Sequence, residues 1–85
     1  MIDLFQKIVL QRLNQVTADE VLKYAKQYGI QVTRKQALEV EKLVKGKNIN
    51  IFNEEERNKL LKQVEAVTSK EAVQLLNQLF AQYVS

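Results

Sequence analysis

A glycine followed by a lysine near the middle of the chain suggests phosphate chemistry, because Gly-Lys pairs occur in phosphate-binding loops. Such a loop has another glycine five positions before the pair, and a serine or threonine directly after the lysine. Here Glu41 stands five positions before Gly46, and Asn48 follows Lys47. The pattern therefore fails at both ends, and Gly46 is better explained as the end of a helix.

Three consecutive glutamates, Glu54 to Glu56, suggest a calcium site, because carboxylate oxygens are preferred calcium ligands. An EF-hand loop that ended at Glu56 would begin at Lys45, and it would place Lys47 and Ile49 at ligand positions, where neither side chain binds calcium. Negative side chains in the first turn of a helix oppose the positive end of its dipole. The three glutamates therefore indicate a helix start.

Histidine and cysteine are absent from the sequence. The commonest general base near neutral pH is therefore missing, as are thiolate metal ligands and any disulfide framework. Tyr24, Tyr28 and Tyr83 carry hydroxyls, but tyrosines on mostly apolar faces usually mark the edge of a core. We predict that the protein is not an enzyme and uses no cofactor and no metal ion.

Basic residues accompany a predicted helix, extended loop and helix at residues 17–45. Ala25 and Gly29 lie four positions apart, as in helix-turn-helix modules, while the longer loop resembles modules of the SAP and LEM type. In such modules cations approach phosphates. The candidate residues are Lys23, Lys26, Arg34, Lys35 and Lys42. Because Glu39 and Glu41 lie on the second helix, beside Lys42, nucleic-acid binding is the alternative interpretation.

The segment after this second helix has a polar side as well as an apolar one. We expect its isoleucines to face the core, which leaves its other residues in water. The candidates for contact with a partner in this segment are Lys45, Lys47, Asn48 and Asn50.

Helices must position all these residues, because apolar residues recur at spacings of three and four and the chain has no proline and two glycines. A first helix is predicted over residues 2–15. Four more are predicted from capping boxes, in which a Ser, Thr or Asn precedes Glu or Gln by three positions. These boxes lie at residues 17–20, 33–36, 53–56 and 68–71. We expect an all-α, compact bundle of about five short helices that forms a single domain over residues 1–85.

Two extended apolar connectors are predicted between these helices, at residues 29–33 and 46–53. Because they carry isoleucine, valine and phenylalanine, we expect them to lie against the core. An open alternative is a short two-stranded contact, in which Ile30 and Val32 of the first connector pair with the second connector.

The chain is short: it has 85 residues, of which 46% are hydrophobic. So short a chain buries a small core, and we expect its stability to be modest or shared with a partner. The last helix has a broad apolar face formed by Ala72, Leu76, Leu79, Phe80 and Tyr83. Charged residues near the N-terminus argue against a signal peptide or a membrane span, so a cytoplasmic protein is expected.

The stretches "LKYAKQYGI", "GKNINIFNEEERNKLL" and "LLNQLF" resemble the YqfT-like family of short uncharacterised proteins from Bacillus-type bacteria. The resemblance covers nearly the whole chain and is most specific at "GKNINIFN". It implies a cytoplasmic bacterial protein, and it supplies no activity, cofactor or site residue.

The sequence therefore favours a protein that acts by binding. The first interpretation is a non-enzymatic protein–protein interaction or regulatory module with a protein partner that the sequence does not identify. A homo-oligomer and the nucleic-acid-binding module at residues 17–45 are open alternatives, and neither a membrane nor a metal partner is expected.

Overall fold

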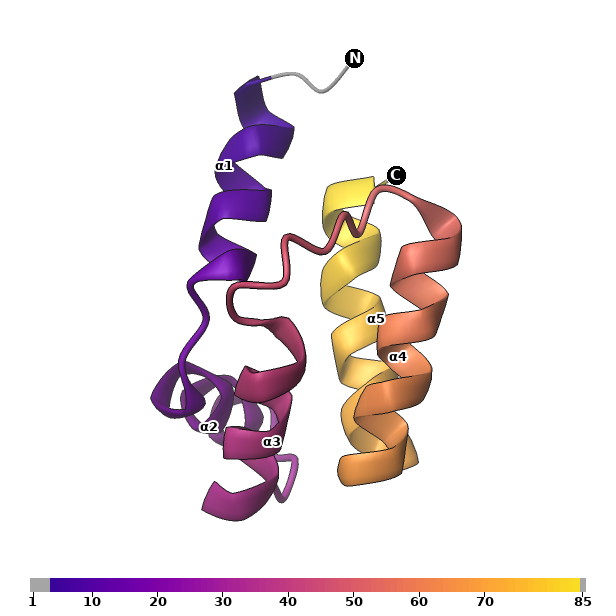
Figure 1. Cartoon of the computed structure of the whole chain (residues 1–85). Coiled ribbons are helices and arrows are strands. Elements are labelled where there is room, and N and C mark those ends of the chain that lie inside the picture. Colours follow the sequence, from indigo (N-terminus) through magenta and orange to yellow (C-terminus); the bar gives the residue numbers. More distant parts are fainter. Residues whose placement is uncertain (1–3, 85) are drawn as a thin grey trace.

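The computed structural model describes the backbone of residues 4–84 and the side chains of residues 4–82. This part of the chain forms the five helices of Figure 1: α1 (Leu4–Asn14), α2 (Ala18–Gln27), α3 (Arg34–Val44), α4 (Glu54–Val67) and α5 (Lys70–Val84). The prediction of an all-α fold is confirmed. The predicted helix start at Ile2 and the predicted core side chain of Tyr83 lie outside what is described.

Three helices begin at the predicted caps. The side-chain oxygens of Thr17, Thr33 and Asn53 each accept a hydrogen bond from the backbone N–H three residues later, at 3.1–3.2 Å. At Thr33 the Gln36 side chain also accepts from the cap's own N–H at 2.9 Å, which completes the capping box. Backbone donors that the helix cannot satisfy itself are thus satisfied locally.

The fourth cap prediction was wrong by one residue. Ser69, rather than Thr68, caps α5, because the Ser69 hydroxyl oxygen accepts from the N–H of Ala72 at 3.2 Å. Thr68 ends α4 instead: its backbone N–H and its hydroxyl both donate to the carbonyl of Val64, at 2.9 and 2.6 Å. A helix end and a helix start therefore occupy adjacent residues.

The second connector lies against the core, as predicted: Ile51 belongs to the buried core, and Ile49 and Phe52 pack against it. Ile51 is 1% exposed, and its carbonyl accepts a hydrogen bond from the Arg57 guanidinium at 3.0 Å. The apolar residues of the first connector are half-buried. Neither connector forms a strand in the described chain, so the alternative of a two-stranded contact is wrong. Gly29 and Gly46 follow α2 and α3 with φ values of 71° and 75°, the left-handed conformation expected after a helix end.

Helices α2 to α5 form the body of the molecule. Helix α3 packs against both α2 and α4, and α4 pairs with α5; Figure 1 shows α4 and α5 as an antiparallel pair. The buried core cluster consists of Val40, Val44, Ile51, Leu60, Val64 and Phe80. Among the described helices, none combines the length and apolar character needed to cross a membrane.

Helix α1 is attached to this body mainly through its C-terminal half. Val9, Leu10 and Leu13 pack against the core cluster, although no described side chain of α1 is fully buried. At its end, the carbonyl of Asn14 accepts from the N–H of Gly46 at 3.0 Å. The N-terminal half of α1 extends past the body, across from α5 (Figure 1).

Candidate partner-binding groove

An apolar groove of about 650 Å³ lies between α1, α2 and α5. Side chains of the core cluster reach its floor, among them Val44, Ile51 and Val64, which are 3%, 1% and 2% exposed. The groove is therefore continuous with the hydrophobic core, which makes it a part of the molecule where further apolar side chains can be buried.

The walls of the groove are more exposed than its floor. On α1, Phe5 and Ile8 line it while remaining 56% and 47% exposed. On α5, Leu76 and Leu79 line it and are half-buried. Tyr24 of α2 completes the wall and is 48% exposed. The apolar face predicted for the last helix is thus partly buried and partly open.

Besides Tyr24 with its hydroxyl, few polar side chains reach the groove: Arg12, Gln15, Glu20 and Thr68. The Thr68 hydroxyl is committed to the Val64 carbonyl, and a carboxylate oxygen of Glu20 lies 3.4 Å from the Thr17 hydroxyl that donates to it. These groups include no nucleophile paired with a base. The groove is equipped to bind apolar side chains and to orient them by a few polar contacts at its edge.

The five basic residues predicted for nucleic-acid binding are exposed, and none lines the groove. Two of them have acidic neighbours. Arg34 lies 2.8 Å from the carboxylate of Asp19, and the Lys42 amine lies 3.9 Å from the carboxylate of Glu39. Counter-charges thus accompany part of the predicted basic set, which lowers its attraction for phosphate.

The four polar residues predicted for partner contact also lie outside the groove, and the two asparagines among them take part in hydrogen bonds of the connector. The N–H of Asn48 donates to the Asn14 side chain at 2.9 Å, and Asn48 has a positive φ of 53°. The Asn50 side chain accepts from the N–H of Phe52 at 3.0 Å. Lys45 and Lys47 are exposed. The two asparagines therefore have structural roles, whereas the two lysines are solvated.

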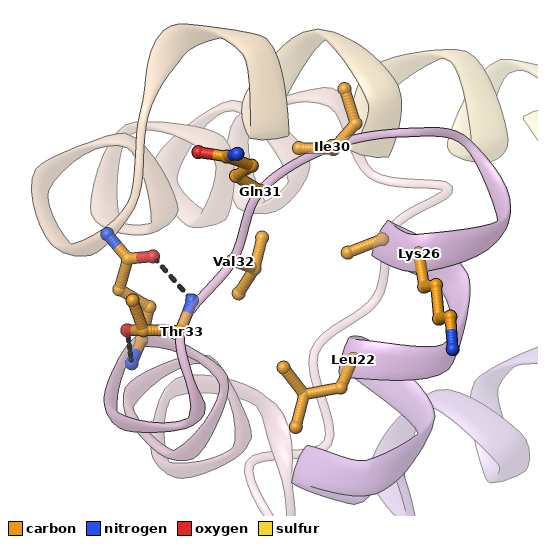
Figure 2. Close-up of a pocket in the computed structure, with 8 residues that line it drawn as sticks. Leu22, Lys26, Ile30, Gln31, Val32 and Thr33 are labelled. Carbon is orange, nitrogen blue, oxygen red and sulfur yellow. Dashed lines mark hydrogen bonds between the residues drawn. The ribbon is translucent and has the colours of Figure 1, made fainter.

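A second depression lies where α2, the first connector and α3 meet (Figure 2). Leu22 and Val32 line it, and the Thr33–Gln36 capping box stands at its edge. In Figure 2 the amine of Lys26 points away from the connector. Thr33 and Gln36 at this edge already bond each other, and the other polar residues that line the depression, Lys26 and Gln31, are exposed.

No group of acidic side chains in the described chain could hold a metal ion. Glu54, Glu55 and Glu56 are exposed in the first turn of α4, as the dipole argument predicted. The Glu56 carboxylate instead accepts from the N–H of Asn50 at 3.4 Å.

The groove was not predicted from the sequence, although both of its apolar walls were. The periodicity predicted an amphipathic first helix, and the broad apolar face of the last helix was interpreted as a possible contact surface, but no groove between the two was predicted. The available signal in the sequence was that apolar residues continue along the full length of α1, including Leu4, Phe5 and Ile8, which the described part of the chain leaves exposed.

Comparison with known proteins places the chain in a family. A family model described as "Protein of unknown function (DUF2624)" matches residues 1–84. The chain is also 66% identical over 82 residues to the Bacillus subtilis (strain 168) protein called "Uncharacterized protein YqfT", an alignment that covers 96% of this chain and 98% of that protein. No solved structure matches it. The predicted resemblance is confirmed, and the chain belongs to the DUF2624 family of bacterial proteins of unknown function.

Proposed function

We propose that this protein is a non-enzymatic interaction or regulatory module that binds a polypeptide in the groove between α1 and α5. The observation that carries the proposal is the groove itself, whose floor is the hydrophobic core and whose walls leave Phe5 and Ile8 about half exposed. Exposed apolar surface that continues into a core is typical of sites that bind other proteins.

The shape of the groove favours a helical segment as the bound element. Helices form its two facing walls, and an amphipathic helix can lay apolar side chains at positions i, i+3, i+4 and i+7 into such a groove. Arg12 and Glu20 line the groove with opposite charges. We therefore expect a bound helix with an apolar stripe and few charges beside it.

The residue inventory supports binding without chemistry. The sequence has no histidine and no cysteine, and the polar side chains that line the groove offer no nucleophile with an adjacent base. Binding of apolar side chains needs only the apolar lining that the groove provides.

Nucleic-acid binding by residues 17–45 is the second candidate. Its support is that all five predicted cations are exposed, and the ion pairs of Arg34 and Lys42 weaken it. Titration of a fluorescent duplex DNA at low salt separates the two candidates. Saturable binding that falls steeply with salt and is lost in Lys23→Glu would favour this second candidate.

The main proposal is tested by photo-crosslinking in living Bacillus subtilis cells, which carry a protein 66% identical to this chain. A photoreactive phenylalanine analogue replaces Ile8 in the groove, and in a matched control it replaces Leu38. Both residues are exposed apolar residues on helices, at 47% and 41%, and Leu38 lies outside the groove. Polypeptide adducts at position 8 but not at position 38 are expected. Equal adducts at both positions, or none at position 8, would contradict the proposal.

A further inference from the structure

We propose that the polypeptide bound in the groove is a second copy of this chain, related by a two-fold axis. In this dimer the N-terminal half of α1 from each copy lies in the groove of the other. The inference rests on the proposed function, because it names the occupant of the same groove.

The first argument is that one chain carries both complementary parts. The N-terminal half of α1 has exposed apolar residues, with Leu4 at 74% and Ile8 at 47%. The groove that could receive them begins on the same helix and extends to α5. In a two-fold dimer the same surface patch of each copy contacts that of the other, so a single interface buries the N-terminal halves of both α1 helices.

The second argument is the amount of surface. The chain exposes 6170 Å², whereas a compact monomer of its mass, 9.9 kDa, exposes about 5,200 Å². The surplus is about 1,000 Å², and each partner in a standard stable interface buries about 800 Å². This surplus is counted over the whole chain with both ends, and among the described residues the exposed apolar side chains of Leu4, Phe5 and Ile8 contribute to it. The chain thus has enough exposed surface for one side of a standard interface.

The third argument is the charge of the groove. One cation, Arg12, and one anion, Glu20, line it, and Arg12 forms no ion pair within the described part of the chain. In a two-fold dimer, Arg12 of one copy can face Glu20 of the other, and the same contact then occurs twice. The exposed lysines of α2 and α3 do not line the groove, so they place no like charges in this interface.

Sedimentation equilibrium of the whole chain tests the inference. At micromolar concentrations we expect a mass twice the 9.9 kDa of one chain. Ile8→Glu should weaken dimer formation by about tenfold or more, because it places an unpaired carboxylate in an apolar contact. Leu38→Glu is the matched control and should remain dimeric with unchanged affinity. A wild-type chain that is monomeric over the whole concentration range would overturn the inference, as would a dimer that Ile8→Glu leaves intact.

A disulfide trap locates the contact independently of how well Ile8→Glu folds. The sequence has no cysteine, so Ile8→Cys introduces one thiol per chain. Ile8 lies near the middle of α1, and two antiparallel copies of this helix that cross at the axis bring the two thiols together. With diamide as the oxidant, Ile8→Cys should give a covalent dimer faster than Leu38→Cys. Equal rates for the two variants would contradict the predicted contact.

These results also separate the inference from the proposed function. If the wild type is monomeric but position 8 forms adducts with another protein in cells, the groove binds a partner of a different kind and only the dimer is wrong. If the wild type is monomeric and position 8 forms no adducts, both proposals are wrong.

Discussion

The carboxylate of Glu41, on α3, accepts a hydrogen bond from the backbone N–H of Ala18, the first residue of α2, at 2.9 Å. This N–H is one of the donors that a helix start cannot satisfy internally, and Ala18 is only 4% exposed. Thr17 satisfies the N–H of Glu20, so a local cap and a distant carboxylate together complete the start of α2. The contact joins residues 23 positions apart and fixes how α2 packs on α3.

Removal of this carboxylate should destabilise the protein measurably. Glu41→Ala leaves a partly buried N–H without its acceptor, and we expect a loss of about 1–3 kcal/mol in the free energy of unfolding, measured with urea. Glu41→Gln keeps an oxygen at this position and should recover part of the loss. Glu39→Ala is the control on the same helix: its ion pair with Lys42 is exposed and 3.9 Å long, so a change within about 0.5 kcal/mol is expected. Equal effects at the two positions would show that the contact is not significant.

Asn14 should be a second position where one side chain stabilises the packing of helices. Its side-chain oxygen accepts from the N–H of Asn48, and its carbonyl accepts from Gly46, so it ties the end of α1 to the second connector. Asn14→Ala removes the side-chain bond and should cost about 0.5–1.5 kcal/mol in urea unfolding. Asn14→Asp keeps an acceptor and should cost less. The comparison residue is Asn77, which is exposed on α5, and Asn77→Ala should be close to neutral.

Local features of this fold were predictable because they depend on neighbouring residues. Thr33 and Gln36 form the predicted capping box, and Gly46, which was predicted to end a helix, has the left-handed conformation that is common there. The cap of α5 was misassigned because Thr68 and Ser69 are both good caps, and the choice depends on where α4 ends. The Thr68 hydroxyl bonds the Val64 carbonyl, which leaves Ser69 to start the next helix.

The groove and the contact of Glu41 with Ala18 were not predictable, since both depend on the relative placement of helices. Periodicity shows that α1 and α5 each have an apolar face, but it does not show which faces meet. Val9 and Leu13 of α1 pack on the core, whereas Ile8, which directly precedes Val9 and points about 100° away from it around the helix, stays 47% exposed. The sequence places all three on one broad apolar stripe, and it does not show how much of that stripe the rest of the molecule covers.

The assignment of Ser69 as the cap of α5 can be tested directly. Ser69→Ala removes the acceptor for the N–H of Ala72 and should cost about 0.5–2 kcal/mol, the usual effect of losing a cap. Ser69→Asp should retain most of the stability, because a carboxylate also accepts this bond and opposes the helix dipole. Thermal unfolding followed by circular dichroism measures both. If Ser69→Ala is neutral, the helix starts elsewhere.

Ile51 should be among the most sensitive core positions even though it lies in a connector. It is 1% exposed and belongs to the core cluster with Leu60 and Val64. Ile51→Ala should cost about 2–5 kcal/mol, whereas Ile51→Val should cost about 0.5–1.5 kcal/mol. The total stability expected for 85 residues is roughly 4–13 kcal/mol. Ile51→Ala should therefore populate the unfolded state at a much lower urea concentration, and a midpoint equal to that of Ile51→Val would contradict its burial.

Asn48 allows folding and binding roles of the second connector to be separated. Its φ of 53° is favourable for glycine, tolerated by asparagine and unfavourable for alanine. Asn48→Gly should leave the free energy of unfolding within about 0.5 kcal/mol of wild type, and Asn48→Ala should cost about 1 kcal/mol.

Neither Asn48 nor Lys47 lines the groove. Photo-crosslinking from position 8 should therefore be unchanged in Asn48→Gly, which removes the amide side chain, and in Lys47→Ser, which removes the charge of an exposed lysine. If either variant abolishes the adducts, the partner also contacts this connector, and the binding surface extends beyond the groove.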